Sequence, residues 1–271
     1  MHPFNKVLLI VFLCFSVAGC STFSFFFERL PWLSSWQLSR MFDLDDDQEV
    51  RVEEVAEQIK EWLETEGFPG LVEELDSGLK LWRDSPSADL VTGLFDELES
   101  YNSRFLAEIA PLVTPLVMSL RDENLNAFEA YIDEKTGDWF ESLETEEDKR
   151  DSRVERLEKW FGDLTDAQVA IVRKHVVLYP DERALRLENT GHWVHLFVDS
   201  VKNARKNEIE NWLREPSVWW TTDYTELRSK NRQQITLILN ELVPTLSERQ
   251  ANRAASELQD WIDELRDVTS K

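Results

Sequence analysis

Residues 157–168 read Leu-Glu-Lys-Trp-Phe-Gly-Asp-Leu-Thr-Asp-Ala-Gln and contain the end of one helix and the start of the next. Gly162 follows the last apolar residues, where glycine commonly ends a helix in the left-handed conformation. Thr165 and Gln168 then match a capping box. In this box the Thr oxygen accepts from an N–H of the first turn and the Gln amide reaches back to the N–H of the cap. The stretch predicts an α-helical chain.

The capping pattern recurs along the chain. The complete copies are Asp45 with Gln48, Thr165 with Gln168, and Ser247 with Gln250, each preceded by Leu. Residues 120–124 are a weaker fourth copy, which ends in Asn124. We interpret the copies as helix starts, because such a cap stabilises a helix by about 1 kcal/mol. The alternative is that the Leu-x-x-x-Gln units also have a role beyond capping.

Apolar residues recur at i, i+3, i+4 and i+7 from Pro31 onward, and hairpin signals such as Asn-Gly or Asp-Gly are missing. We therefore predict an all-α fold, an elongated or layered multi-helix bundle with residues 31–271 as a single domain. The expected helices cover residues 31–42, 45–66, 69–83, 87–109, 122–143, 154–161, 165–178, 180–214, 223–242 and 247–267. We expect Gly67 to close the second helix and Pro111 to break the fourth.

Near the end of four predicted helices, an apolar residue is followed three positions later by Trp and four positions later by a second apolar residue. These trios are Ile59-Trp62-Leu63, Leu157-Trp160-Phe161, Ile209-Trp212-Leu213 and Leu258-Trp261-Ile262. The spacing places each trio on one helix face, and Trp buries a large area, so we interpret the trios as core anchors. The alternative is a tryptophan-lined groove.

The first twenty residues have the parts of a secretory signal. Lys6 lies in a short basic region, and residues 7–17 are an apolar run too short to span a bilayer. Residues 17–20, Val-Ala-Gly-Cys, resemble the bacterial lipobox. The resemblance implies that residues 1–19 are a lipoprotein signal peptide and that Cys20 becomes the lipidated first residue, carrying acyl chains such as palmitate.

Two acyl chains hold a protein stably on a membrane. Ser21 follows Cys20, whereas an Asp there would resemble an inner-membrane retention signal. We therefore expect anchoring at the periplasmic face of the outer membrane of a Gram-negative bacterium. Residues 20–30 should form a short tether whose four Phe favour the membrane interface. No later apolar run reaches about 18 residues, so we expect no further span.

The chain is strongly acidic. Without Lys6, 29 basic and 53 acidic side chains remain, a net charge of −24. Such a surface repels phosphate backbones and anionic headgroups, which argues against nucleic-acid binding and against lying on the membrane, but it accepts cationic partners. Cys14 leaves with the signal and Cys20 is acylated, so no thiol remains for a disulfide, a nucleophile or a soft metal site.

The sequence shows no Ser–His–Asp order, no glycine-rich phosphate loop and no Cys/His cluster, so we predict no enzyme and no cofactor. One candidate metal site is the stripe of Glu188, His192, His195 and Asp199, which share one face of a predicted long helix. Imidazoles and carboxylates bind zinc or copper. A single helix face does not complete a tetrahedral site, so we favour a solvated or helix-packing stripe.

Two segments carry a resemblance to a known family. They are Trp36-Gln-Leu-x3-Phe42-Asp-Leu-Asp-x2-Gln48 and residues 155–168, Glu-Arg-Leu-Glu-Lys-Trp-Phe-Gly-Asp-Leu-Thr-Asp-Ala-Gln. Over about residues 31–265 the chain resembles a family of all-helical proteobacterial lipoproteins classed as a domain of unknown function. The resemblance implies an envelope lipoprotein and nothing catalytic.

The unit Leu164-Thr165-x-x-Gln168 is also similar to the LTxxQ motif of small periplasmic chaperones, which hold unfolded clients. This chain is larger than those proteins, and it is acidic where their client-holding surface is basic. We expect a non-enzymatic envelope lipoprotein that binds other envelope proteins, as a chaperone-like holder or as an accessory subunit of an outer-membrane assembly. The alternative is a periplasmic ligand- or metal-binding lipoprotein that uses the stripe of residues 188–199. A third is a cell-wall hydrolase that uses two of the many carboxylates.

Overall fold

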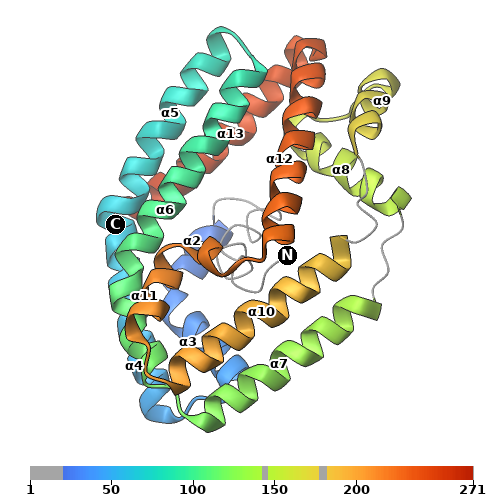
Figure 1. Ribbon diagram of the computed structural model, residues 1–271. Coiled ribbons are helices and arrows are strands. Elements are labelled where there is room, and N and C mark those ends of the chain that lie inside the picture. The colour runs from blue at the N-terminus through green and yellow to red at the C-terminus, as the bar shows by residue number, and fades with distance from the viewer. Residues whose placement is uncertain (1–20, 142–145, 177–181, 271) are drawn as a thin grey trace.

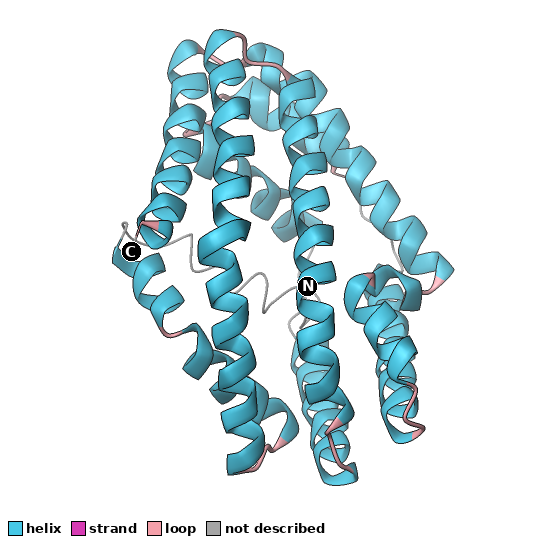
Figure 2. Cartoon of the chain, turned by 90° about the vertical axis from the view of Figure 1, so that its left-hand side faces the viewer, coloured by secondary structure: helices cyan, strands magenta, loops and turns pink. Residues whose placement is uncertain are grey.

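The computed structural model describes residues 21–141, 146–176 and 182–270. Every regular element in these ranges is a helix and they contain no strand, which confirms the all-α prediction (Figures 1 and 2). Cys20 and the predicted helix ends at residues 143 and 178 lie outside the described residues.

In chain order the helices are α2 (Ser21–Glu28), α3 (Leu30–Phe42), α4 (Asp46–Trp62), η2 (Leu63–Gly67), α5 (Phe68–Asp84), α6 (Ala88–Met118), α7 (Asp122–Glu141), α8 (Glu146–Phe161), α9 (Asp166–His175), α10 (Glu182–Lys202), α11 (Lys206–Arg214), η3 (Pro216–Trp219), α12 (Thr222–Leu242), η4 (Val243–Thr245) and α13 (Glu248–Thr269). Among these, η2 is a π-helical turn, and η3 and η4 are short 3-10 turns.

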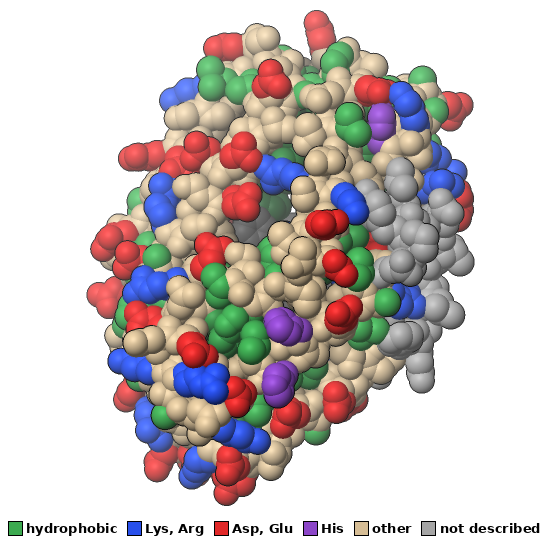
Figure 3. All heavy atoms as spheres, viewed as in Figure 1, with side chains coloured by type: hydrophobic (Ala, Val, Ile, Leu, Met, Phe, Trp, Pro, Cys, Tyr) green, Lys and Arg blue, Asp and Glu red, His purple; other side chains and the backbone are tan. Residues whose placement is uncertain are grey.

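Four of the helices form a closed ring of contacts. α5 contacts both α6 and α13 along one side of the molecule (Figure 1). α6, α12, α10 and α11 contact one another in that order, and α11 returns to α6, so these four helices close a ring. The space-filling view from the same side shows a hollow near the middle of the molecule (Figure 3).

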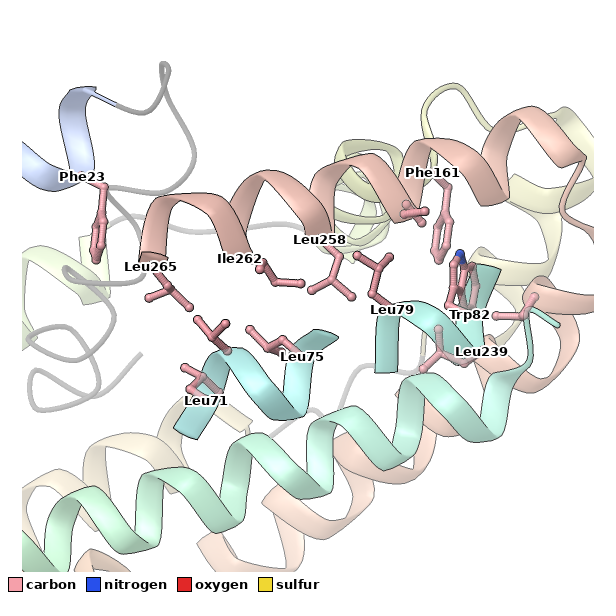
Figure 4. Packing of buried hydrophobic residues seen from close by; sticks show 14 of the residues in the cluster. Phe23, Leu71, Leu75, Leu79, Trp82, Phe161, Leu239, Leu258, Ile262 and Leu265 are labelled. Atoms are coloured by element: carbon pink, nitrogen blue, oxygen red, sulfur yellow. The ribbon is translucent and has the colours of Figure 1, made fainter. Parts of the chain in front are cut away.

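Two clusters of buried apolar side chains hold the helices together. The first lies largely between α5 and α13, where Leu79 and Ile262 are almost fully buried (Figure 4). The second is aromatic and includes Phe42, Phe128, Trp193, Phe197, Trp212 and Trp219. α6 contributes to both clusters, through Phe95 to the first and Ala110 to the second. The long α6 therefore connects the two parts of the core.

The prediction that Gly67 closes a helix is wrong. α4 continues through η2 into α5, and the N–H of Phe68 donates to the carbonyl of Leu63, five residues earlier. Gly67 is itself helical, with φ −63°. A Cβ at this position would lie 2.7 Å from Trp62 Cζ3 and 3.1 Å from Tyr101 Oη of α6. Glycine is therefore needed here for close packing against Trp62 and Tyr101 and not as a terminator.

The prediction that Pro111 breaks the fourth helix is also wrong, because α6 runs through Pro111 and Pro115 to Met118. A proline lacks the N–H that binds the carbonyl four residues earlier in a helix. Arg214 of α11 supplies a donor instead, because its Nη1 lies 2.9 Å from the carbonyl oxygen of Ala107. The packing of α11 on α6 thus compensates for the hydrogen bond that Pro111 removes.

The single long helix predicted over residues 180–214 is divided into α10 and α11, with Ala204 between them in the left-handed region at φ 53°. The turn folds α11 back onto α10, so that Trp193 and Trp212 stack with ring centroids 5.8 Å apart. A left-handed alanine costs about 1–3 kcal/mol. Burying one indole contributes about 4–6 kcal/mol at 25 cal/mol/Å². The burial of the two tryptophans therefore outweighs the strain.

Two further boundaries differ from the prediction. α8 begins at Glu146 and not at Val154, so residues 146–153 are also helical. The expected tether is also helical, because it forms α2. Phe23 and Phe27 of α2 are buried, with ring centroids 6.2 and 5.3 Å from that of Phe68. α2 is therefore a packed part of the body.

Within the described ranges, no single helix combines the length and the apolar content of a membrane span. α6 together with residues 122–137 of α7 meets these criteria as a pair, but the two helices are bent by 112°. Both helices also contribute side chains to the buried clusters.

Candidate functional site

The three complete capping patterns form hydrogen bonds at helix N-termini. The side chains of Asp45, Thr165 and Ser247 begin α4, α9 and α13, and each accepts from the backbone N–H three residues later at 2.9–3.3 Å. The Gln at that position accepts from the N–H of the cap at 3.0–3.1 Å. Each box thereby satisfies two N–H groups that have no helical acceptor.

Two of the boxes are joined to each other across the fold. Gln168 Nε2 donates to Gln250 Oε1 at 3.1 Å, and Gln250 Nε2 donates to Gln168 Oε1 at 2.9 Å. The same amides donate to the backbone carbonyls of Thr245 and Asp163, both at 3.1 Å. The two side chains are buried, yet their polar atoms are hydrogen-bonded, which avoids the cost of an unsatisfied buried amide.

The remaining box is joined in the same way to the weaker fourth copy. Gln48 Nε2 donates to Asn124 Oδ1 at 3.0 Å, and Asn124 Nδ2 donates to Gln48 Oε1 at 3.3 Å. Arg121 occupies the cap position of this copy and has no side-chain acceptor. Its N–H binds Asn124 Oδ1 at 3.0 Å, and its guanidinium instead forms an ion pair with Asp45.

The two joined pairs belong to equivalent junctions of four helices. In one junction α3 contacts α7 and α4 contacts α6; in the other α8 contacts α13 and α9 contacts α12. Each junction is closed by two mutually hydrogen-bonded amides that lie 76 or 82 residues apart in the chain. These amides are directed into the protein, so the geometry favours a structural role for the Leu-x-x-x-Gln units.

The candidate metal stripe lies on α10. Glu188, His192 and His195 are exposed, while Asp199 is half-buried and forms an ion pair with Arg205 at 2.9 Å. In the described part of the chain, no group of three or more His, Cys, Asp or Glu is positioned to hold a metal ion. No other described helix therefore supplies a further metal ligand to the stripe, and Asp199 is already engaged in the ion pair with Arg205 at the end of α10.

The tryptophans of the four trios lie in or against the core. Trp212 is buried, and Trp62 and Trp160 pack partly buried against the first cluster. Trp261 contacts Trp160, with ring centroids 5.5 Å apart. This arrangement agrees with the interpretation of the trios as core anchors.

A different set of aromatic residues is exposed on α2 and α3. Phe25, Arg29, Trp32, Trp36 and Arg40 are spaced at i, i+4, i+7, i+11 and i+15, and we call them the aromatic–arginine stripe. The three aromatic side chains are 48%, 55% and 47% exposed, which is unusual for residues of this size. Phe26 adjoins the stripe and is 37% exposed.

The side chains of the aromatic–arginine stripe contact one another in two groups, Phe25 with Arg29 and Trp36 with Trp32 and Arg40. Trp32 and Trp36 stack with ring centroids 6.3 Å apart. The guanidinium of Arg29 lies 3.6 Å from the ring centroid of Phe25, and that of Arg40 lies 5.0 Å from the ring of Trp36. Neither guanidinium forms an ion pair with a described carboxylate. The stripe thus presents aromatic rings and two cations together, held by stacking and cation–π contacts.

The opposite face of the same helices is buried. Phe23 and Phe27 of α2 belong to the first cluster, and Met41 and Phe42 of α3 belong to the second. α2 and α3 are therefore apolar on both faces, and only the inner face is covered by the described protein. An exposed aromatic surface of this kind marks an interaction site.

The rest of the surface is acidic. Residues 43–271 contain 52 acidic and 27 basic side chains, a net charge of −25, and Figure 3 shows Asp and Glu spread over the visible face. Many cations are paired, as in Arg104 with Glu74 at 2.7 Å and Lys174 with Glu241 at 2.8 Å. The hydrogen bonds from Lys174 Nζ lower the pKa of the Glu241 carboxyl. The unpaired surplus is negative.

Sequence reasoning placed the capping residues but missed the aromatic–arginine stripe. The helical spacing of its residues was available as a signal, but it crosses the boundary at residue 30 between the expected tether and the first expected helix. The inner and outer faces are also both apolar, so periodicity alone does not say which side is buried.

A family described as a family of unknown function (DUF6279) matches residues 40–225 of the chain. No curated protein and no solved structure matches it.

Proposed function

The chain belongs to DUF6279, a family of unknown function, and we propose that it is a lipid-anchored envelope protein that binds other proteins and has no enzymatic activity. It is attached through Cys20 to the periplasmic face of the outer membrane of a Gram-negative bacterium. In this role it is a chaperone-like holder of clients or an accessory subunit of an outer-membrane assembly.

The charge of the helical body carries the proposal. A net charge of −25 over residues 43–271 creates a field that attracts cationic surfaces and accelerates their encounter with the protein. The ion pairs with Arg104 and Lys174 show that such carboxylates accept cations at the surface. The partner that fits is a protein with a basic patch or a basic unfolded segment.

The N-terminal region supports the anchor. The lipobox pattern ends at Cys20, and α2 begins at Ser21 and packs into the body through Phe23 and Phe27. An anchor at Cys20 therefore holds the folded body directly at the membrane, where other envelope proteins are concentrated. Replacing Cys20 by Ala should abolish palmitate labelling and release the protein from membranes, whereas retained label and membrane fractionation would contradict the anchor.

In-cell crosslinking followed by mass spectrometry tests the binding role. One or two stoichiometric partners indicate an accessory subunit, and a broad set of exported proteins that grows under envelope stress indicates a holder of clients. In either case we expect basic partners, and capture that weakens as salt rises, because the Debye length falls to about 3 Å at 1 M salt. Capture of no protein at any salt concentration would contradict the proposal.

A further inference from the structure

We propose that the aromatic–arginine stripe lies flat on the lipid bilayer and turns the acidic body away from it. This inference rests on the proposed anchor at Cys20. The partner of the stripe is then a lipid surface, and α2 and α3 lie in the membrane interface in place of the free tether that the sequence suggested. We call this position of α2 and α3 on the bilayer the seat.

The stripe begins only a few residues after the proposed lipid site in the chain. α2 begins at Ser21, the residue after the proposed lipid site, and Phe25 lies only about 6 Å further along a helix that rises about 1.5 Å per residue. Trp32 and Trp36 follow on α3, which begins at Leu30 directly after α2, and both side chains are exposed. Acyl chains at Cys20 therefore bring the stripe to the level of the lipid headgroups without any linker that would separate them.

The aromatic and arginine side chains of the stripe are of the kinds that bind at a membrane–water interface. Trp is enriched at membrane–water interfaces, where its amphipathic ring lies at the headgroup level. An interfacial helix inserts its apolar face about 5–10 Å into the boundary between headgroups and acyl chains. The exposed apolar area for this insertion is supplied by Phe25, Phe26, Trp32 and Trp36. Arginine stems lie along apolar surface while their guanidinium groups reach the polar layer, so the cations above Phe25 and Trp36 are suited to lipid phosphates.

The net charge of α2 and α3 differs in sign from that of the rest of the body. The charged residues in residues 21–42 are Glu28, Arg29 and Arg40, a net of +1, whereas residues 43–271 carry −25. An anionic bilayer repels the body and does not repel the stripe. The same charges that argue against the whole protein lying on a membrane therefore orient it, with α2 and α3 toward the lipid.

The inner face of these helices limits how deeply they enter. Phe23 and Phe27 are committed to the first core cluster and Met41 and Phe42 to the second, so α2 and α3 do not leave the body to cross the bilayer. Only the outer face is available. This geometry is that of a helix lying in the interface plane.

The test uses the full, lipidated protein in vesicles of phosphatidylethanolamine and phosphatidylglycerol that contain brominated phospholipids, which quench nearby tryptophans. We expect quenching in the wild type. The W32F/W36F variant removes two of the eleven tryptophans and should lose this quenching. The matched control W160F/W261F removes another contacting pair, on α8 and α13, and should retain it.

A charge-reversal pair keeps the reporter tryptophans in place. R29E/R40E should lose the quenching while the protein still floats with the vesicles through its lipid. The control R51E/R249E reverses two exposed arginines of α4 and α13 and should keep it. Far-UV circular dichroism checks that each variant is folded.

The outcomes separate this inference from the proposed function. Palmitate-labelled protein that floats with vesicles but shows no quenching overturns the seat and leaves the anchor intact. Quenching that persists in W32F/W36F also overturns it, because another surface then faces the lipid. Protein that takes up no palmitate and does not float overturns the anchor, and the seat with it.

Discussion

Gln168 and Gln250 lie 82 residues apart in the sequence and donate their side-chain amides to each other, at 3.1 and 2.9 Å. Each Oε1 also accepts from the N–H of its own helix cap, Thr165 or Ser247. Each Gln thus completes the hydrogen bonds of its own helix N-terminus and also joins that N-terminus to the start of a second helix in the core. The pair of Gln48 and Asn124 repeats the relationship at the other junction.

This mutual bonding predicts that Gln168→Ala destabilises the protein by more than the loss of one cap. The substitution leaves one N–H of the buried Gln250 amide without its acceptor, Gln168 Oε1, which costs about 1–3 kcal/mol. In a double-mutant cycle with Gln250→Ala, measured by urea unfolding, we expect a coupling of about 0.5–3 kcal/mol. Combining Gln168→Ala with Gln48→Ala, from the other junction, is the control and should be additive. Additive losses for Gln168 and Gln250 would contradict the pairing.

Thr165→Ala separates capping from pairing. The substitution removes the Oγ1 that accepts from the N–H of Gln168 at 3.3 Å but leaves both glutamines in place. We expect a loss of about 1 kcal/mol in the free energy of unfolding, as for other N-caps, and a smaller loss for Thr165→Ser, which keeps a hydroxyl. A fully stable Thr165→Ala variant that fails to capture partners would instead give the motif a role in binding.

Arg214→Ala should destabilise α6 through Pro111. Without Arg214 Nη1 the carbonyl of Ala107 loses its donor, and we expect a cost of about 0.5–1.5 kcal/mol. Pro111→Ala restores the backbone N–H that binds this carbonyl within the helix. In the Pro111→Ala background, Arg214→Ala should therefore cost less. An equal cost in both backgrounds, measured by chemical unfolding, would show that the guanidinium acts only through its ion pair with Glu210.

Gly67→Ala and Gly78→Ala should have opposite effects, although both glycines lie on the continuous column of α4, η2 and α5. A Cβ at position 67 would meet Trp62 at 2.7 Å, and overpacking of this kind costs about 1–3 kcal/mol. A Cβ at position 78 meets nothing within 4 Å, so the helix propensity of alanine should stabilise the protein by about 0.5–1 kcal/mol. Thermal unfolding of the two variants measures the difference. A stable Gly67→Ala variant would contradict the close approach of Trp62 and Tyr101 to this position.

Asp45 should make the stability of the protein depend on acid pH. The hydrogen bond from the backbone N–H of Gln48 and the ion pair with Arg121 hold the pKa of the Asp45 carboxyl below its ordinary value of 3.8. Because the folded-state pKa is the lower one, the contribution of Asp45 is complete above the unfolded-state pKa and is lost as pH falls through the folded-state pKa.

Asp45→Asn keeps a capping side chain but does not titrate. Urea unfolding of this variant should therefore show a shallower loss of stability between about pH 5 and pH 2 than in the wild type. Asp46→Asn removes the neighbouring carboxylate as a control and should retain the steeper loss. Equal slopes for wild type and Asp45→Asn would contradict the assignment.

The sequence alone determined that the fold is all-α and where several helices begin. A capping box acts within four residues, and Gly162 adopts its left-handed φ of 72° next to the helix that it ends, so local hydrogen bonds are enough to specify these positions. The periodic spacing of apolar residues added the all-α fold class for the same local reason.

Only the tertiary structure decided how the helices continue, turn and expose their faces. Pro111 remains helical because the side chain of Arg214 approaches Ala107, which lies 107 residues earlier in the chain. Ala204 turns because the burial of Trp193 and Trp212 outweighs its strain. The sequence likewise did not show that Phe23 and Phe27 would be buried while the aromatic–arginine stripe stays exposed. Burial is set by which distant helix covers a face, and that information is absent from any local window of the chain.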